Sequence, residues 1–202
     1  MLTKLGFAYQ SLRQYDLALT HQLRALDIRQ SKPDVDQIST TGNLFGIANA
    51  YWRQQKLSDA LVYAHKSLSV NESIQSGNDS DIAANLATLA NIYYHFGDES
   101  RALKLAKRAL ILLENCTCAN TVGLASILNN IGAIQFSTGR FDEALVTFIR
   151  VFTICERTVP EKHPKRIAIT QNIQQVIAMQ RQQENALNSS AYWSQFGKFL
   201  LF

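Results

Sequence analysis

The chain has 202 residues, of which 47% are apolar and 18% are charged, and it contains only three Pro and nine Gly. This composition is ordinary for a globular protein, and no strand-like alternation competes with the helical periodicity of the sequence. The formal net charge of +4 is mild, and Lys and Arg are spread along the predicted helices. A solvated surface is therefore favoured over a nucleic-acid-binding patch.

Membrane and targeting signals are missing from the sequence. No apolar run approaches the roughly 20 residues of a membrane-spanning helix, and the first ten residues lack the apolar run of a signal peptide. We therefore expect a cytoplasmic protein in which Cys116, Cys118 and Cys155 are reduced thiols. Cys116 and Cys118 could supply two metal ligands, but no second Cys pair or nearby His completes a tetrahedral set. No metal or other cofactor is predicted.

The first predicted helical hairpin occupies about residues 1–31. Its first helix has almost no lead-in, because helical spacing is already present in Leu2, Leu5, Gly6 and Tyr9. Such a start is typical of an array cut from a longer protein. The second helix is expected to begin at Asp16 and to end before a loop at residues 31–36, which contains Pro33.

Two further hairpins are predicted over about residues 37–75 and 80–115. The earlier one has a first helix at Gln37–Gln54 and a second helix starting at Ser58. A loop rich in turn-forming residues, 76–80, separates the two hairpins.

The turn of the third hairpin has the clearest signals in the chain. Gly97 can adopt the backbone values that end a helix, and Asp98 can accept hydrogen bonds from the free N–H groups that start the next one. Small residues on both sides of this turn, Ala90, Ala102 and Ala109, predict that the two helices approach closely. A larger side chain there would separate them.

The fourth hairpin is predicted over about residues 122–159, with helices at Gly123–Thr138 and Phe141–Arg157. Loops at 116–120 and 160–164 flank it. A partial fifth copy follows at 164–187, with a helical face in Arg166–Gln183.

Residues 188–202 no longer match the repeated pattern. Their aromatic and apolar residues are spaced for an amphipathic helix: Tyr192, Trp193, Phe196, Phe199 and Leu200. We interpret this segment as a capping helix or tail that covers the end of the array. A helix that lies on a membrane surface or docks a partner is the alternative.

The hairpins recur with a constant step of 42 residues. A small residue in each first helix occurs at Gly6, Ala48, Ala90 and Gly132, and an Ala opens each second helix at Ala18, Ala60, Ala102 and Ala144. An aromatic position is filled by Tyr9, Tyr51 and Tyr93, and by Gln135 in the fourth copy. The turn glycines Gly97 and Gly139 are replaced by Arg13 and Gln55 in the first two copies. A constant step over four copies indicates a stacked helical repeat.

These residues resemble the tetratricopeptide repeat family, whose pattern is matched by Leu89, Ala90, Tyr93, Ala102 and Ala109. The usual repeat of that family is about 34 residues. The longer step, with the segment 159–164 before a new helix, resembles the kinesin-light-chain type of array. The resemblance covers about residues 1–187. It implies an all-α, right-handed superhelical solenoid of antiparallel helix hairpins, with about nine or ten helices.

The first helices of such an array line a concave groove, so their residues on the unpacked side are candidates for ligand contact. The step of 42 places Trp52, Tyr94 and Phe136 in one row and several Asn in neighbouring rows, with Gly46 as a bare groove position. Asn can donate to and accept from an extended peptide backbone, and aromatic rings offer rigid contact area. The candidate peptide-binding residues are Lys4, Asn49, Trp52, Arg53, Asn91, Tyr94, His95, Asn130, Phe136 and Asn172.

A structural explanation of the same residues stays open. The aromatic rings could pack against neighbouring second helices, and the Asn side chains could cap or bridge helices within the stack.

The predicted function is that of a non-catalytic interaction scaffold or adaptor that binds an extended protein segment or peptide. The resemblance to the kinesin-light-chain type implies acidic peptides that carry an aromatic residue. The alternative is a regulatory or scaffolding arm of a larger, multidomain protein with enzymatic activity elsewhere. Catalysis by these residues is not predicted, since no nucleophile, acid and His occur at a known spacing and no phosphate-binding loop is present. The sequence leaves the partner and the oligomeric state open.

Overall fold

The computed structural model describes residues 2–31, 37–74, 79–116 and 121–197, with side chains up to Leu187. Within these ranges the protein consists of nine helices, which confirms the predicted all-α fold. They are α1 (Leu2–Ser11), α2 (Tyr15–Gln30), α3 (Gln37–Arg53), α4 (Leu57–Ser73), α5 (Asp79–His95), α6 (Glu99–Asn115), α7 (Thr121–Ser137), α8 (Phe141–Thr158) and α9 (Pro164–Gly197). Three of the predicted loops, at 31–36, 76–80 and 116–120, fall largely outside the described residues.

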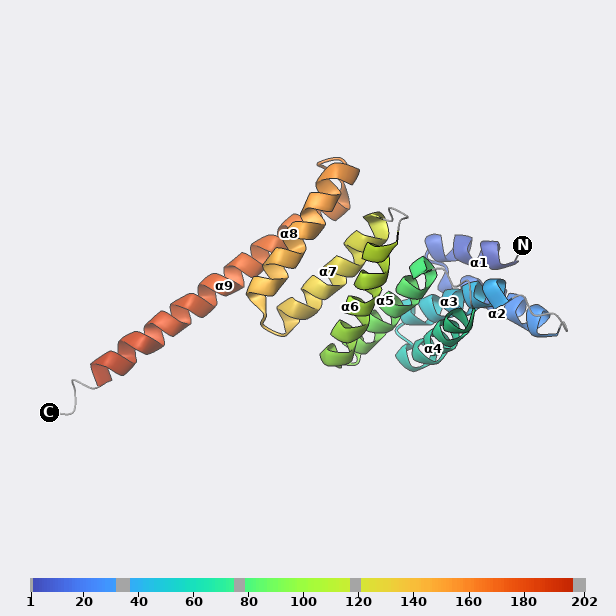
Figure 1. Ribbon diagram of the computed structural model, residues 1–202, viewed down its shortest axis with the longest axis horizontal. Coiled ribbons are helices and arrows are strands. Elements are labelled where there is room, and N and C mark those ends of the chain that lie inside the picture. Colours follow the sequence, from blue (N-terminus) through green and yellow to red (C-terminus); the bar gives the residue numbers. More distant parts are fainter. Residues whose placement is uncertain (1, 32–36, 75–78, 117–120, 198–202) are drawn as a thin grey trace. The chain divides into compact units, whose positions relative to one another are not determined.

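Contacts between residues divide the chain into two units, Met1–Ile127 and Leu128–Phe202, which are described separately. In the first unit α1 pairs with α2, α3 with α4, and α5 with α6, as consecutive hairpins (Figure 1). Each second helix packs on the next hairpin, α2 on α3 and α4 on α5, while α1 contacts α3 and α3 contacts α5. In the second unit α8 packs on α9. Stacking of hairpins along the chain is the predicted arrangement.

The four turns inside the hairpins share one backbone conformation. Arg13, Gln55, Gly97 and Gly139 all have positive φ angles, of 59°, 61°, 78° and 74°. In each turn the next residue donates its N–H to the carbonyl of the repeated aromatic position, at Tyr9, Tyr51, Tyr93 and Gln135. Gly adopts this left-handed conformation freely, whereas a residue with a side chain is strained in it. The first two turns therefore retain strain that the last two avoid.

Asp98 caps α6 as predicted, because its carboxylate accepts a hydrogen bond of 2.9 Å from the backbone N–H of Arg101. The corresponding residues before α2, α4 and α8 are Gln14, Lys56 and Arg140, and none of them makes a side-chain cap. These helices begin at Tyr15, Leu57 and Phe141. The starts expected at Asp16 and Ser58 are each one residue late.

The small residues of the repeat lie where the helices cross. Ala18, Ala48, Ala60, Ala90, Ala102 and Ala144 have no exposed surface at all. At the two glycines of the same series, an added Cβ would lie 2.6 Å from the side chain of Gln22 for Gly6, and 2.6 Å from that of Phe148 for Gly132. Gln22 and Phe148 occupy the position that Ala64 and Ala106 fill in the middle repeats. The first helix therefore has glycine where the facing residue of the second helix is large, and alanine where that residue is small.

Ala90→Leu and Ala102→Phe are each expected to lower the free energy of unfolding by roughly 1–3 kcal/mol, because the added atoms would have to displace a packed helix. Urea denaturation of the two variants measures this loss. Ala8→Leu, at an exposed position of α1, is the control and should change stability little. Unchanged melting temperatures for both buried variants would contradict a close crossing.

In the first, second and fourth repeats, the position that holds Tyr9, Tyr51 or Gln135 contacts a residue twelve positions later in the second helix. Tyr9 stacks on His21 with ring centroids 5.3 Å apart, and Tyr51 stacks on Tyr63 at 5.6 Å. Burial raises the pKa of the Tyr51 hydroxyl above its usual value, and the nearby Tyr63 and Asp59 add to that shift. In the fourth repeat the same pair is Gln135 and Thr147.

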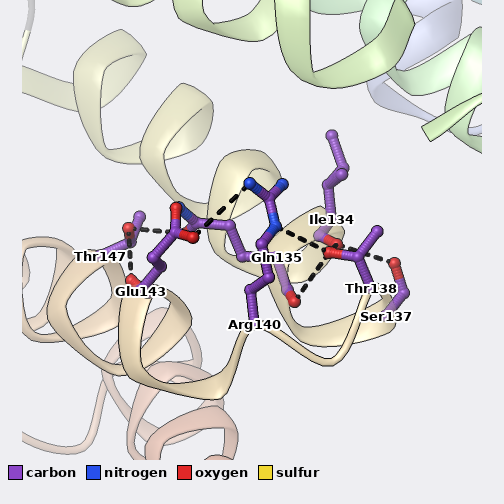
Figure 2. A network of polar contacts seen from close by, with 7 residues as sticks. All are labelled: Ile134, Gln135, Ser137, Thr138, Arg140, Glu143 and Thr147. Carbon is purple, nitrogen blue, oxygen red and sulfur yellow. Dashed lines mark hydrogen bonds and ion pairs between the residues drawn. The ribbon is translucent and has the colours of Figure 1, made fainter. Parts of the chain in front are cut away.

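Figure 2 shows how the buried Gln135 replaces the aromatic residue. Its amide oxygen accepts a hydrogen bond of 2.8 Å from the Thr147 hydroxyl, and its amide nitrogen donates to the Glu143 carboxylate at 3.1 Å. Arg140 pairs with the same carboxylate at 3.6 Å and donates to the Thr138 hydroxyl at 3.2 Å. The pair is aromatic in the first two repeats, whereas both of its residues are polar in the fourth. The buried amide of Gln135 is therefore hydrogen-bonded.

A buried polar network joins α1, α2 and α3. Gln22 and Asn43 are completely buried, and the Asn43 amide nitrogen donates to the Gln22 side-chain oxygen at 2.9 Å and to its backbone carbonyl at 3.2 Å. The Asn43 side-chain oxygen accepts from Arg29 and from the Thr3 hydroxyl. Arg29 also donates to the Ser39 carbonyl at 2.8 Å. This network adds polar contacts to the apolar packing of Leu26, Leu44 and Ile47 between the first two hairpins.

α9 is one continuous helix of 34 residues. Residues 188–197 therefore continue α9, and the aromatic side chains expected to cap the array lie outside the described side chains. At the position of the buried small residues, α9 carries an exposed Gln174. In the described ranges, α9 packs on α8 and is followed by no second helix. The capping role of 188–202 stays a prediction.

The structure describes two of the three cysteines that were expected to be reduced thiols. Cys155 is a free, buried thiol, but Cys116 is disulfide-bonded, so the reduced state expected for it is wrong. Cys118 lies outside the described residues.

Across the part of the chain that the structure describes, none of the helices combines the length and apolar character needed to cross a membrane. The same part contains no cluster of three or more His, Cys, Asp or Glu suited to a metal ion.

Candidate functional site

The predicted groove residues of the first unit lie on α3 and α5, two first helices that contact each other. On α3, Ile47, Ala48 and Ala50 are completely buried, whereas Asn49 and Trp52 are half-buried and Arg53 is exposed. α5 repeats this division, with Asn91 and Tyr94 half-buried and His95 exposed. The candidates therefore lie on the faces of these helices that packing leaves accessible.

Trp52, Arg53, Tyr94 and His95 form one cluster across α3 and α5. The ring of His95 meets Trp52 edge to face at 6.1 Å and Tyr94 at 5.8 Å. The guanidinium of Arg53 lies 4.4 Å from the centre of the Trp52 ring, in a cation–π contact. Four of the predicted residues are thus brought together, as a surface of aromatic rings with a permanent positive charge.

Two predicted amides lie one helical turn before this cluster. The side chains of Asn49 and Asn91 are half-buried and make no hydrogen bond within the described part of the chain. The backbone carbonyl of Asn91 lies 2.8 Å from Nδ1 of His95, which fixes that ring relative to α5. Both amides are therefore available to an external donor or acceptor.

The remaining candidates are not part of the cluster. Lys4 is exposed on α1 and has no described contact with it. Asn130, Phe136 and Asn172 belong to the second unit. Phe136 packs on Phe141 beside its own turn, at 5.5 Å, and Asn172 donates weakly to Asn129 at 3.4 Å. Phe136 and Asn172 therefore also take part in contacts within the second unit, as the structural explanation of these residues requires.

The expectation that Gly46 is a bare groove position is wrong. Gly46 is buried, and a Cβ there would lie 2.6 Å from the side chain of Gln22 on the preceding hairpin. Its carbonyl accepts a hydrogen bond from Gln10. Thr88, at the same position in α5, is also buried. In the second and third hairpins this position is therefore buried and does not line a groove.

A cavity of about 380 Å³, which the sequence does not predict, lies next to the cluster. It lies at the ends of α1 and α3 and is lined by Gln10, Ser11, Arg13, Tyr15, Trp52, Arg53 and Gln55. The available signal was the pair of substitutions in the turn, where Arg13 and Gln55 replace the glycines of the later repeats. Without the structure, nothing indicated that these turns share one cavity.

Comparison with known families finds two models, both described as tetratricopeptide repeat. One matches residues 40–115, and the other matches residues 1–32 and 124–165. No catalytic family is found. Among curated proteins, none is detectably similar to this chain in sequence.

Several solved structures share the fold. BtubC (BKLC) from P. vanneervenii is 19% identical with a TM-score of 0.76, over 100% of this chain and 81% of that one. A kinesin light chain-like protein from Podosopora anserina, with nearly identical TPR-like repeats, is 16% identical with a TM-score of 0.72, over 93% and 88%. A Rap protein complexed with Competence and Sporulation Factor is 16% identical with a TM-score of 0.74, over 93% of this chain and 50% of that one. At such low identity these similarities establish the fold alone.

Proposed function

Since the chain belongs to the tetratricopeptide repeat family, whose repeats are generally protein–protein interaction modules, we propose that it binds an extended peptide segment of a partner protein. The binding surface is the face of α3 and α5 that carries Asn49, Asn91 and the cluster of Trp52, Arg53, Tyr94 and His95. The single observation that carries the proposal is the pairing of unbonded amides with accessible aromatic rings on two adjacent helices. Amides would hold the peptide backbone, and rings would contact its side chains.

Charge favours an acidic ligand with an aromatic residue. Arg53 adds a permanent positive charge beside Trp52, and Lys4 and His95 are the other basic candidates. No carboxylate occurs among the predicted residues. Binding is therefore expected to weaken as the salt concentration rises, since exposed charges are screened.

The candidates of the second unit, Asn130, Phe136 and Asn172, are retained as a second contact region of the same proposal. In the repeat, Phe136 is equivalent to Trp52 and Tyr94, and Asn130 and Asn172 are equivalent to Lys4. A cytoplasmic location is also retained.

A scaffolding or regulatory arm of a larger protein is the alternative. The observation in its favour is that the chain spans half the length of the similar Rap protein, whose structure contains a bound factor. Peptide binding and a place in a larger protein are compatible.

The test is Asn91→Ala, measured with a peptide selected on the natural chain from a library of acidic, aromatic-containing sequences. The affinity should fall by about 1–3 kcal/mol, because a peptide backbone group would lose its partner. Thermal stability should hardly change, since Asn91 has no side-chain partner to lose.

Asn115→Ala is the matched control, because it removes the same amide from an exposed position at the end of α6. Its affinity and melting temperature should match those of the natural chain. If Asn91→Ala loses stability without a specific loss of affinity, the amide is structural and the groove assignment is wrong.

A further inference from the structure

The geometry points to an oxyanion-binding site in the cavity between the α1–α2 and α3–α4 turns. We propose that this cavity binds a carboxylate or phosphoryl group. The binding of the oxyanion does not depend on the proposed function. Only the inference that a protein ligand carries this group rests on that function.

The charge of the cavity is the first argument. Its lining contains two guanidinium groups, Arg13 and Arg53, and no carboxylate. The Arg13 side chain makes no ion pair or hydrogen bond within the described residues, and the described contact of the Arg53 guanidinium is the Trp52 ring. Asp16 lines an adjoining pocket that Arg13 also lines, and its carboxylate accepts a hydrogen bond of 2.8 Å from Gln54. Two positive charges therefore line a cavity that has no carboxylate in its own lining.

The other lining groups suit the same ligand. Gln10, Gln55 and Ser11 supply amides and a hydroxyl, and the Gln10 amide is already oriented by its hydrogen bond to the Gly46 carbonyl. Tyr15 and Trp52 add aromatic surface. A water molecule occupies roughly 30 Å³ of liquid, so a cavity of about 380 Å³ has room for an oxyanion together with the group that carries it. Guanidinium is the side chain that best matches the planar or tetrahedral oxygens of such groups.

Backbone strain is an independent argument. Arg13 and Gln55 are the non-glycine residues with positive φ in the described chain, and both line this cavity. The later repeats have Gly97 and Gly139 at the same position, so the fold does not need a side chain there. Strain that the fold could avoid is commonly retained where a side chain has a function. The N–H of each strained residue donates at 3.0 Å to the carbonyl three residues earlier, which fixes both turns.

The experiment uses Trp52 as its own reporter. The full chain contains two Trp, so Trp193→Phe leaves Trp52 as the single Trp. In this background, phenyl phosphate and benzoate are titrated at constant ionic strength, since they carry the same ring on different oxyanions. We expect a saturable change in Trp52 fluorescence with at least one of them.

Arg13→Gly should weaken that binding by about tenfold or more, since a charged partner is lost. The variant is expected to remain folded, because glycine relieves the strain at this turn. Arg13→Gln removes the charge but keeps a side chain at the strained turn, and it should weaken binding to a similar extent. Lys104→Gln removes one charge from exposed α6, and its affinity should be unchanged.

Tighter binding of phenyl phosphate would identify a phosphoryl ligand, and tighter binding of benzoate a carboxylate ligand. The proposal is overturned if neither probe saturates, if Arg13→Gly binds as before, or if Lys104→Gln weakens binding equally. Asn91→Ala should leave binding of the small probes unchanged, so failure of the groove and failure of this site are distinguishable.

Discussion

Asn43→Leu is expected to lower the free energy of unfolding by about 2–5 kcal/mol, the largest loss predicted for a single substitution here. Asn43 is completely buried and connects Gln22, Arg29 and Thr3. Leucine has a similar volume but neither donor nor acceptor. The Gln22 amide, which is also completely buried, would lose a partner, and the Arg29 guanidinium would keep only part of its hydrogen bonds.

Urea denaturation followed by circular dichroism measures the loss. Asn49→Leu is the matched control, because it makes the same change on the same helix at a half-buried position without a side-chain partner. It should alter stability by about 0.5 kcal/mol or less. Equal losses in the two variants would show that the network contributes nothing beyond helix packing.

Gly132→Ala is expected to lower the free energy of unfolding by about 1–3 kcal/mol, although alanine is the better helix former by about 1 kcal/mol. The added methyl group would lie 2.6 Å from the ring of Phe148, which is almost completely buried and cannot turn away freely. Thermal denaturation of the single variant measures the loss.

Gly42→Ala is the control for helix propensity, because no atom lies within 4 Å of the added methyl group. It should raise stability by up to about 1 kcal/mol. The double variant Gly132→Ala/Phe148→Ala recreates the pair found at Ala48 and Ala64, and should lose less than the sum of its two single changes. Additive losses would contradict direct contact between the two positions.

Features that recur every 42 residues could be predicted from the sequence. The buried small positions and the turn glycines recur, and the structure confirms them. Gln22, Arg29 and Asn43 could not be predicted as a network, because Ala64 and Asn71 replace Gln22 and Arg29 one repeat later, and only Asn43 has the same residue there, Asn85. Each of these side chains is hydrogen-bonded in part to another of the three. A single polar residue in a helical pattern does not indicate its partner.

The candidate site was predictable only in part, for a related reason. A step of 42 places residues at equivalent positions on successive first helices, but exposure also depends on the hairpin that precedes each helix. Gly46 and Thr88 are buried, whereas Lys4 is exposed on α1, before which no helix is described. Trp52 and Tyr94 are half-buried on α3 and α5, and their role in binding stays a prediction.

The arrangement of helices in the first unit also has a consequence for the route by which it folds. In that unit, the principal contacts join consecutive helices or neighbouring first helices, so interacting residues are close in the sequence. Low contact order of this kind favours fast folding, and each hairpin gains its stability from the hairpins beside it. Opening is then a sequence of local steps that starts at a hairpin with one described neighbour. Amide protons of α1 and α2 should become accessible to solvent before those of α3 and α4, which have neighbours on both sides.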